Sequence, residues 1–290
     1  MKFLNLLPAA IAVSMIASCS NREHNPELIT EVPVTIHVDG FTVSQSDLPA
    51  TKATPAANVD AITLAFYQGT TEVYKTTQQI TDNSTFDSFG DFSLTLPMGS
   101  YNLVAIAYMD REASPFTLTS PTEAAYTGER AYETFLCSDD LSITNATAID
   151  MTVTLDRIVS QLQVLSTDGK AENVSKVRMT FSAGSKTFNP STGLAISNTG
   201  FSNTVNVSAT AGSTSNSLSF LFLATDEQEI DVTVETLDAD GNTLFSKTIE
   251  GVLFKRNRVT KLTGPMYSAA ASGSFQLNTD WLDEVDPISF

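Results

Sequence analysis

The chain has 290 residues, of which 33 are acidic and 16 basic, so its formal net charge is −17 at pH 7. This charge repels phosphate backbones, and no cluster of Lys and Arg with aromatic residues offsets it, which argues against nucleic-acid binding. With 42% hydrophobic and 17% charged residues, the composition is that of a globular protein with one large domain or two ordinary ones.

The first 18 residues have the pattern of an export signal, in which Lys2 precedes an apolar run too short to span a bilayer. The run ends in small residues before Cys19, as in lipoprotein signals, so an acylated Cys19 is expected to begin the mature chain. More than one acyl chain gives stable anchoring. The sequence therefore predicts a signal peptide over 1–18 and a lipid anchor at Cys19, with an ordinary export signal as the alternative.

Residues 19–30 are polar and predict a tether between the lipid and the folded body. Apolar and polar residues then alternate over 32–38 and 62–66, which predicts two strands. A hairpin follows over 92–107, with Pro and Gly in its turn. The pattern weakens between 110 and 148, where a short helix around 121–132 is one option.

Alternation returns in the second half of the chain and predicts further strands, so we expect about twelve to fourteen short strands and an all-β protein. A lone strand followed by a hairpin occurs in both halves, which suggests that the halves share one plan. We predict two antiparallel β-sandwich domains in tandem, over 31–155 and 156–290. The strands expected after the stretch with a weak pattern lie at 149–155, 159–164, 177–181, 205–207, 218–223, 230–236 and 244–249.

Residues suited to catalysis or metal binding are scarce. His24 lies in the predicted tether and His37 in the middle of a strand, so neither is placed as a base beside a nucleophile. Residues 238–242 are rich in Asp, which raises the possibility of a calcium-binding loop. Their sequence lacks Gly and Glu at the positions where an EF-hand loop requires them, so a hairpin turn is favoured. With Cys19 acylated, Cys137 has no disulfide partner and is expected to be buried and inert. We predict neither an enzyme nor a metal site, and no cofactor beyond the lipid on Cys19.

Behind the lipoprotein cysteine, the hairpin at 94–104, the junction at 151–162 and the segment 256–264 follow in an order and spacing that resemble the fimbrillin superfamily of Bacteroidetes, most closely its fimbrial anchor subunits. The resemblance implies two transthyretin-like Greek-key sandwiches. It also implies an outer-membrane lipoprotein, exposed on the cell surface as part of a fimbria, that joins other fimbrial subunits by strand exchange.

In stalk subunits of that superfamily a protease removes the first strand, and the C-terminal strand of a neighbour fills the groove. Here no arginine lies between Arg22 and Arg111, which favours an anchor that keeps its first strand. Lys52, in the loop after that strand, is the candidate cleavage site for the alternative, a processed stalk or tip subunit with a ligand on a host or bacterial surface. A glycan-binding surface lipoprotein is a further alternative, which the single Trp disfavours.

Residues 275–290 are the candidate donor strand, preceded by an Ala, Ser and Gly stretch that suits a hinge. The competing interpretation makes them the last strand of the second sandwich, with Trp281 in its core. The candidate donor residues are Phe275, Leu277, Trp281 and Leu282.

Overall fold

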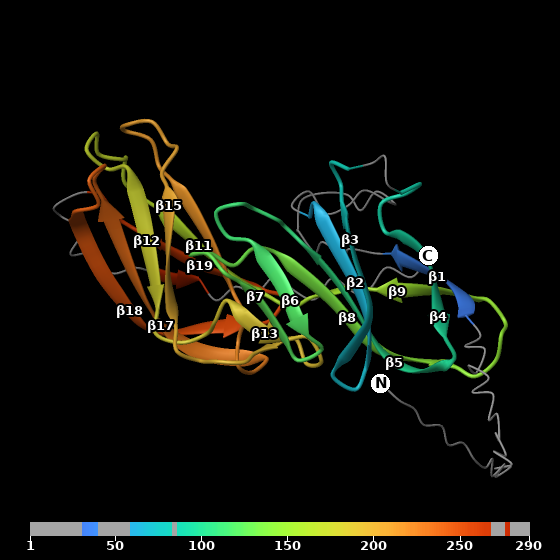
Figure 1. Ribbon diagram of the computed structural model, residues 1–290. Coiled ribbons are helices and arrows are strands. Elements are labelled where there is room, and N and C mark those ends of the chain that lie inside the picture. The colour runs from blue at the N-terminus through green and yellow to red at the C-terminus, as the bar shows by residue number, and fades with distance from the viewer. Residues whose placement is uncertain (1–30, 40–58, 83–85, 268–275, 279–290) are drawn as a thin grey trace, which may run out of the picture.

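A computed structural model describes residues 31–39, 59–82, 86–267 and 276–278 of the chain. Within these ranges the backbone forms twenty β-strands and no helix, which confirms the all-β prediction (Figure 1). No described segment is an apolar helix of membrane-spanning length. The strands outnumber the prediction because several are only two to four residues long and carry too little alternation to be found in the sequence.

Two facing sheets form the first half of the molecule. Their strand orders are β4-β1-β9 and β10-β8-β5-β2-β3, and their inward side chains make one apolar core in which the rings of Phe66 and Tyr101 meet edge to face. The strands are β1 (Glu31–Asp39), β2 (Ala61–Gln68), β3 (Thr71–Gln79), β4 (Asp91–Pro97), β5 (Gly99–Tyr108), β8 (Thr134–Ile143), β9 (Ile149–Thr154) and β10 (Asp156–Arg157).

A second pair of sheets forms the other half, with strand orders β16-β11-β19-β20 and β15-β12-β17-β18. It encloses its own core, in which Phe181 packs against Phe201 and Phe254. The strands are β11 (Ser160–Ser166), β12 (Lys176–Phe181), β15 (Phe201–Asn206), β16 (Asn216–Leu221), β17 (Glu227–Leu237), β18 (Thr243–Lys255), β19 (Val259–Gly264) and β20 (Gln276–Asn278).

The two halves follow the same strand plan. The orders β4-β1-β9 and β8-β5-β2-β3 become β16-β11-β19 and β18-β17-β12-β15 when each strand is exchanged for its counterpart along the chain. In both halves the first and last strands of the plan pair in parallel, whereas the other described pairs are antiparallel. A parallel pair needs a long connection, and here the rest of each half supplies it. Strands β10 and β20 lie outside this shared plan.

A small fifth sheet joins the halves. The hairpin of β6 (Phe116–Ser120) and β7 (Glu123–Tyr126) comes from the first half, and that of β13 (Thr187–Asn189) and β14 (Leu194–Ala195) from the second. Strands β7 and β13 pair with each other, giving the order β14-β13-β7-β6. This sheet lies between the two sheet pairs in Figure 1. It replaces the short helix considered for 121–132, because the side chains of Ala124 and Tyr126 alternate into the core beneath it.

The predicted division at residue 155 stays a prediction. Strand β10 follows that position but pairs with β8 of the first half, through Asp156 opposite Leu136. The core between the halves contains apolar side chains of both, including Tyr67 and Ile106 from the first and Phe188 from the second. The halves are therefore connected by a shared sheet and a shared core as well as by the chain.

Candidate assembly site

The first strand is an integral part of its sheet. Strand β1 lies between β4 and β9 and is paired along both edges. Alternation places Val32, Val34, Ile36 and Val38 on the core side, where each is at most 7% exposed. Loss of β1 would leave an apolar slot with unpaired backbone groups on both sides, which is the kind of groove that accepts a foreign strand.

On the outer face of β1, His37 contacts both neighbouring strands. Its Nδ1 lies 2.8 Å from Oδ1 of Asp91 on β4, and its Nε2 lies 3.1 Å from Oδ1 of Asp150 on β9. The hydrogen bond to Asp91 raises the pKa of His37 above 6.5, partial desolvation opposes this, and the negative charges of both carboxylates add to the rise. His37 is thus a surface link across three strands.

We expect His37 to titrate above 6.5 in the folded protein. Because the folded pKa is raised, the stabilisation is fully present below the unfolded value of 6.5 and is lost as the pH rises through the folded pKa. Histidine ring titration by NMR measures this directly. The variant Asp91→Asn should lower the pKa, whereas Asp87→Asn, at an exposed carboxylate four residues earlier in the chain, should not. A pKa at or below 6.5 in the unaltered chain would contradict the assignment.

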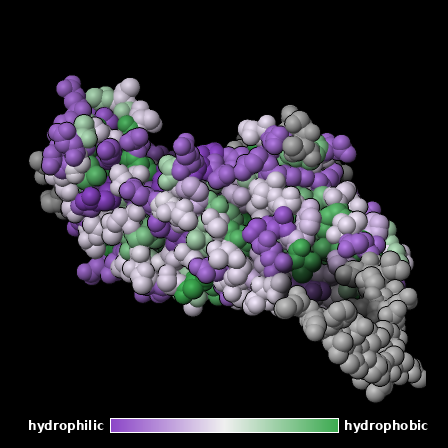
Figure 2. Space-filling view, in the orientation of Figure 1, coloured by the Kyte–Doolittle hydropathy of each residue, from purple (hydrophilic) through white to green (hydrophobic). Residues whose placement is uncertain are grey.

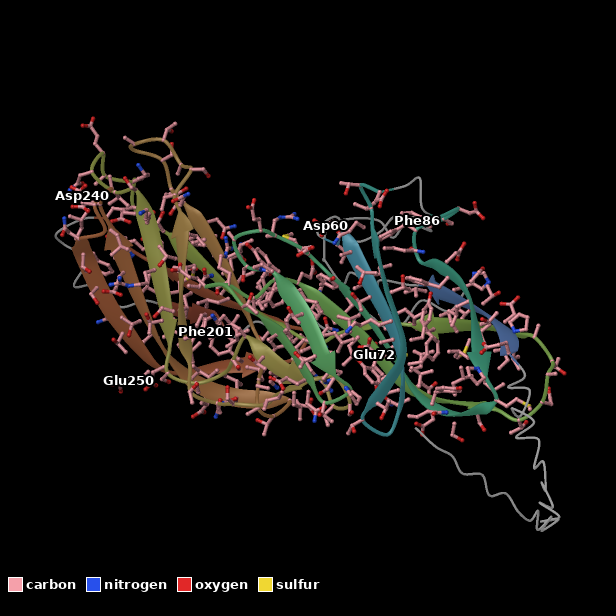
Figure 3. The ribbon with its side chains drawn as sticks, in the orientation of Figure 1. Asp60, Glu72, Phe86, Phe201, Asp240 and Glu250 are labelled. Atoms are coloured by element: carbon pink, nitrogen blue, oxygen red, sulfur yellow. The ribbon has the colours of Figure 1, made fainter. Side chains whose placement is uncertain are left out.

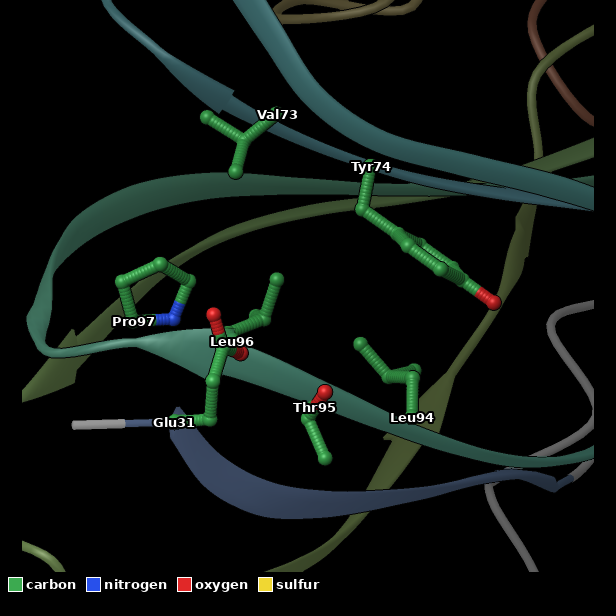
Figure 4. Close-up of a pocket in the computed structure, with 7 residues that line it drawn as sticks. All are labelled: Glu31, Val73, Tyr74, Leu94, Thr95, Leu96 and Pro97. Carbon is green, nitrogen blue, oxygen red and sulfur yellow. The ribbon is translucent and has the colours of Figure 1, made fainter. Parts of the chain in front are cut away.

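A shallow hollow of about 430 Å³ opens beside the start of β1 (Figure 4). It lies between β3 and β4, which are edge strands of the two facing sheets. The lining offers one carboxylate, the hydroxyls of Tyr74 and Thr95, and otherwise apolar side chains, so it suits an apolar side chain better than an acid–base reaction. The lining residues are Glu31, Val73, Tyr74, Leu94, Thr95, Leu96 and Pro97.

The Asp-rich segment 238–242 is the turn between β17 and β18, as the sequence predicts. The carboxylate of Asp238 accepts hydrogen bonds from the backbone and side-chain nitrogens of Asn242, at 2.8 and 2.9 Å, and these bonds lower its pKa. Figure 3 shows Asp240 at the far end of this hairpin. Among the described residues, no group of three or more His, Cys, Asp or Glu is placed to hold a metal ion.

Cys137 is half-buried in β8 and has no disulfide. Burial raises the pKa of its thiol, and the charges of Asp139 and Asp156 add to the rise, which keeps the thiol protonated and weakly reactive.

Of the predicted donor residues, only Leu277 falls within the described ranges. It belongs to β20, which pairs antiparallel with the outer edge of β19 and places Leu277 opposite Leu262. Part of the candidate donor segment therefore forms an edge strand of its own chain. The other predicted site residues, Cys19, Lys52, Phe275, Trp281 and Leu282, lie outside the described residues.

The surface seen in Figure 2 is mainly hydrophilic, with separate small apolar patches. In the described ranges the exposed large hydrophobic residues are aliphatic or Met, and none is aromatic: they are Val73, Ile80, Met98, Ile196, Leu218 and Leu244.

The model of a family of unknown function, DUF6562, matches residues 30–288. No curated protein matches the sequence. A candidate adhesin from Bacteroides ovatus ATCC 8483 has a similar structure, with 15% identity, a TM-score of 0.51 and coverage of 82% of this chain and 88% of the other. The fimbrial anchor protein Mfa2 from Porphyromonas gingivalis has 9% identity and a TM-score of 0.49 over 85% and 95%. At 15% identity, the similarity to the adhesin shows that the chain shares its fold.

Proposed function

The chain belongs to the DUF6562 family, and we propose that it is a structural subunit of a cell-surface fimbria, namely the lipid-anchored base subunit that attaches the fimbria to the outer membrane. The observation that carries this proposal is the pairing of β1. This strand is paired along both edges and directly follows the predicted tether. An anchor linked to the membrane through its N-terminus must keep this strand, because cleavage after it would separate the lipid from the body.

The intact mass of the mature protein from native outer membranes tests this role. A diacylated or triacylated chain that begins at Cys19 is expected, and Cys19→Ser should abolish both the lipid mass and the membrane association. A chain that begins at Ala53 would mean cleavage after Lys52. That result would overturn the base-subunit role and favour the processed stalk or tip subunit instead.

We further propose that the base subunit engages the first stalk subunit through residues 275–290. Two features of β20 support a donor role: it lies outside the seven-strand plan shared by the two halves, and within the described residues it pairs with β19 over three residues, at the edge of the sheet. A strand at the edge of a sheet can leave without breaking the pairing between the remaining strands.

Deletion of residues 275–290 is expected to leave the protein folded and to abolish its attachment to fimbriae. Circular dichroism with a urea titration measures the first effect, and recovery of fimbrial subunits with the protein from outer membranes measures the second. The matched control keeps the full chain and replaces the exposed Thr144 and Thr147 of the turn before β9 by serine. Loss of the cooperative unfolding transition after the C-terminal deletion would show that the segment is a core strand of the second sandwich.

A further inference from the structure

The parallel pairing of the end strands has a mechanical consequence. In the first half the chain enters at Glu31, the start of β1, and leaves at Thr154, the end of β9. The register runs in parallel from Val34 opposite Ile149 to Asp39 opposite Thr154. Tension between entry and exit therefore pulls the two strands in opposite directions along their common axis, so that all their hydrogen bonds are loaded together in shear.

The second half repeats this arrangement. Strand β11 begins at Ser160, β19 ends at Gly264, and the pair runs in parallel from Gln161 opposite Val259 to Ser166 opposite Gly264. In each half the first strand is also paired along its other edge, β1 with β4 and β11 with β16. We call the pairs β1–β9 and β11–β19 the strand clamps.

The segment between the clamps is fixed to both halves. Residues 155–159 connect β9 to β11, and Leu155, Ile158 and Val159 are at most 3% exposed. The amide of Ile158 donates to the carbonyl of Thr134 at 3.1 Å, in the first half. The carbonyl of Val159 accepts from the amide of Asn257 at 2.9 Å, in the second. Little free chain is available here to yield under tension before the clamps are loaded.

We propose that the chain carries tensile load through the two strand clamps in series. This property belongs to the folded chain and goes beyond the proposed fimbrial role, so its test does not require a fimbria. Forced unfolding is governed by the barrier to unfolding, and a barrier that requires many hydrogen bonds to break together is higher than one crossed a single bond at a time.

Single-molecule force measurement can test the clamp by changing only the point of attachment. The full chain is used with Cys19 and Cys137 replaced by serine and with cysteines introduced for DNA handles. Glu31→Cys with Thr154→Cys loads β1 and β9 in shear. Glu31→Cys with Ala148→Cys pulls the same pair apart from one end, because Ala148 immediately precedes β9. All three attachment sites are exposed.

The expected result is a severalfold higher opening force for the Glu31 and Thr154 handles than for the Glu31 and Ala148 handles. Equal forces in the two geometries, or a higher force when the strands are peeled, would overturn the proposal. Equal urea midpoints and slopes are the control that the introduced cysteines leave the stability of the fold the same in both variants. Should Ala148→Cys unfold the chain, the exposed neighbour Thr147 provides the same peeling geometry.

Discussion

Replacing Phe188 by alanine should lower the free energy of unfolding by about 3–5 kcal/mol. Phe188 is fully buried in β13, between the two halves. Its ring stacks on Phe222 at a centroid distance of 4.4 Å and also lies near Phe116 of the first half, at 6.2 Å. The substitution removes apolar contacts and leaves a cavity in a core that the rigid pairing of β7 with β13 keeps from collapsing.

The free energy is measured by urea unfolding of the full chain. Phe201→Ala is the matched control, because Phe201 is half-buried at one edge of the second core, where it packs on Phe181, and does not belong to the shared core. The control should cost less than Phe188→Ala. A smaller loss for Phe188→Ala than for Phe201→Ala would mean that the two halves hold together without this aromatic contact.

Strands with one buried face could be located from the sequence. Residues 32–38 alternate strictly, and the structure buries one set of side chains and leaves the other at the surface, which is the condition under which alternation is informative. The strands at 92–107 were located for the same reason, but the predicted hairpin is wrong. Strand β4 pairs with β1, whereas β5 pairs with β2 and β8, so the turn between β4 and β5 connects the two facing sheets. The common plan of the two halves could be suggested because each contains a lone strand and, further along, two alternating strands joined by a short connection, in the same order.

The junction between the halves was not predicted, although the sequence contains one signal for it. Strands β2 and β5 carry apolar side chains on both faces, as in Ala61–Tyr67 and Leu103–Tyr108. Such a run indicates a strand that is covered on both sides. The sheet that covers the second face of β2 and β5 could not be identified from the sequence. Its strands are two to five residues long, and it depends on a pairing of Ala124 and Ala125 with Thr187 and Phe188, far along the chain.

The sequence also predicted that residues 238–242 form a hairpin turn, because the hydrogen bonds of this turn join residues that are close together in the chain. Asp238 and Asn242 form the turn with each other, so their spacing alone carries the information. The ion pair of Glu133 with Arg157 has no such local signal. One residue lies in the stretch with a weak pattern and the other beyond β9, and only the folded sheet brings them together.

Arg157→Met should lower the free energy of unfolding by about 3–5 kcal/mol, because it removes one partner of a buried ion pair. The Nη2 of Arg157 lies 2.5 Å from Oε1 of Glu133, and the two side chains are only 10% and 7% exposed. The guanidinium also lies 5.2 Å from the centre of the Phe135 ring and donates to Oδ1 of Asn257 in the second half at 3.4 Å. The interaction thus contributes to the junction as well as to the first half.

A double variant separates the loss of the ion pair from the loss of packing. Arg157→Met with Glu133→Leu removes both charges and should recover most of the free energy, because apolar groups of similar volume often replace a buried ion pair at little cost. Glu72→Gln is the surface control: its partner Lys75 lies 2.6 Å away, but both side chains are exposed to 35% or more, so a loss of about 1 kcal/mol or less is expected. If Arg157→Met cost no more than Glu72→Gln in urea unfolding, the buried pair would contribute no more than a surface pair. The halves would then be held together by the shared sheet and the aromatic core alone.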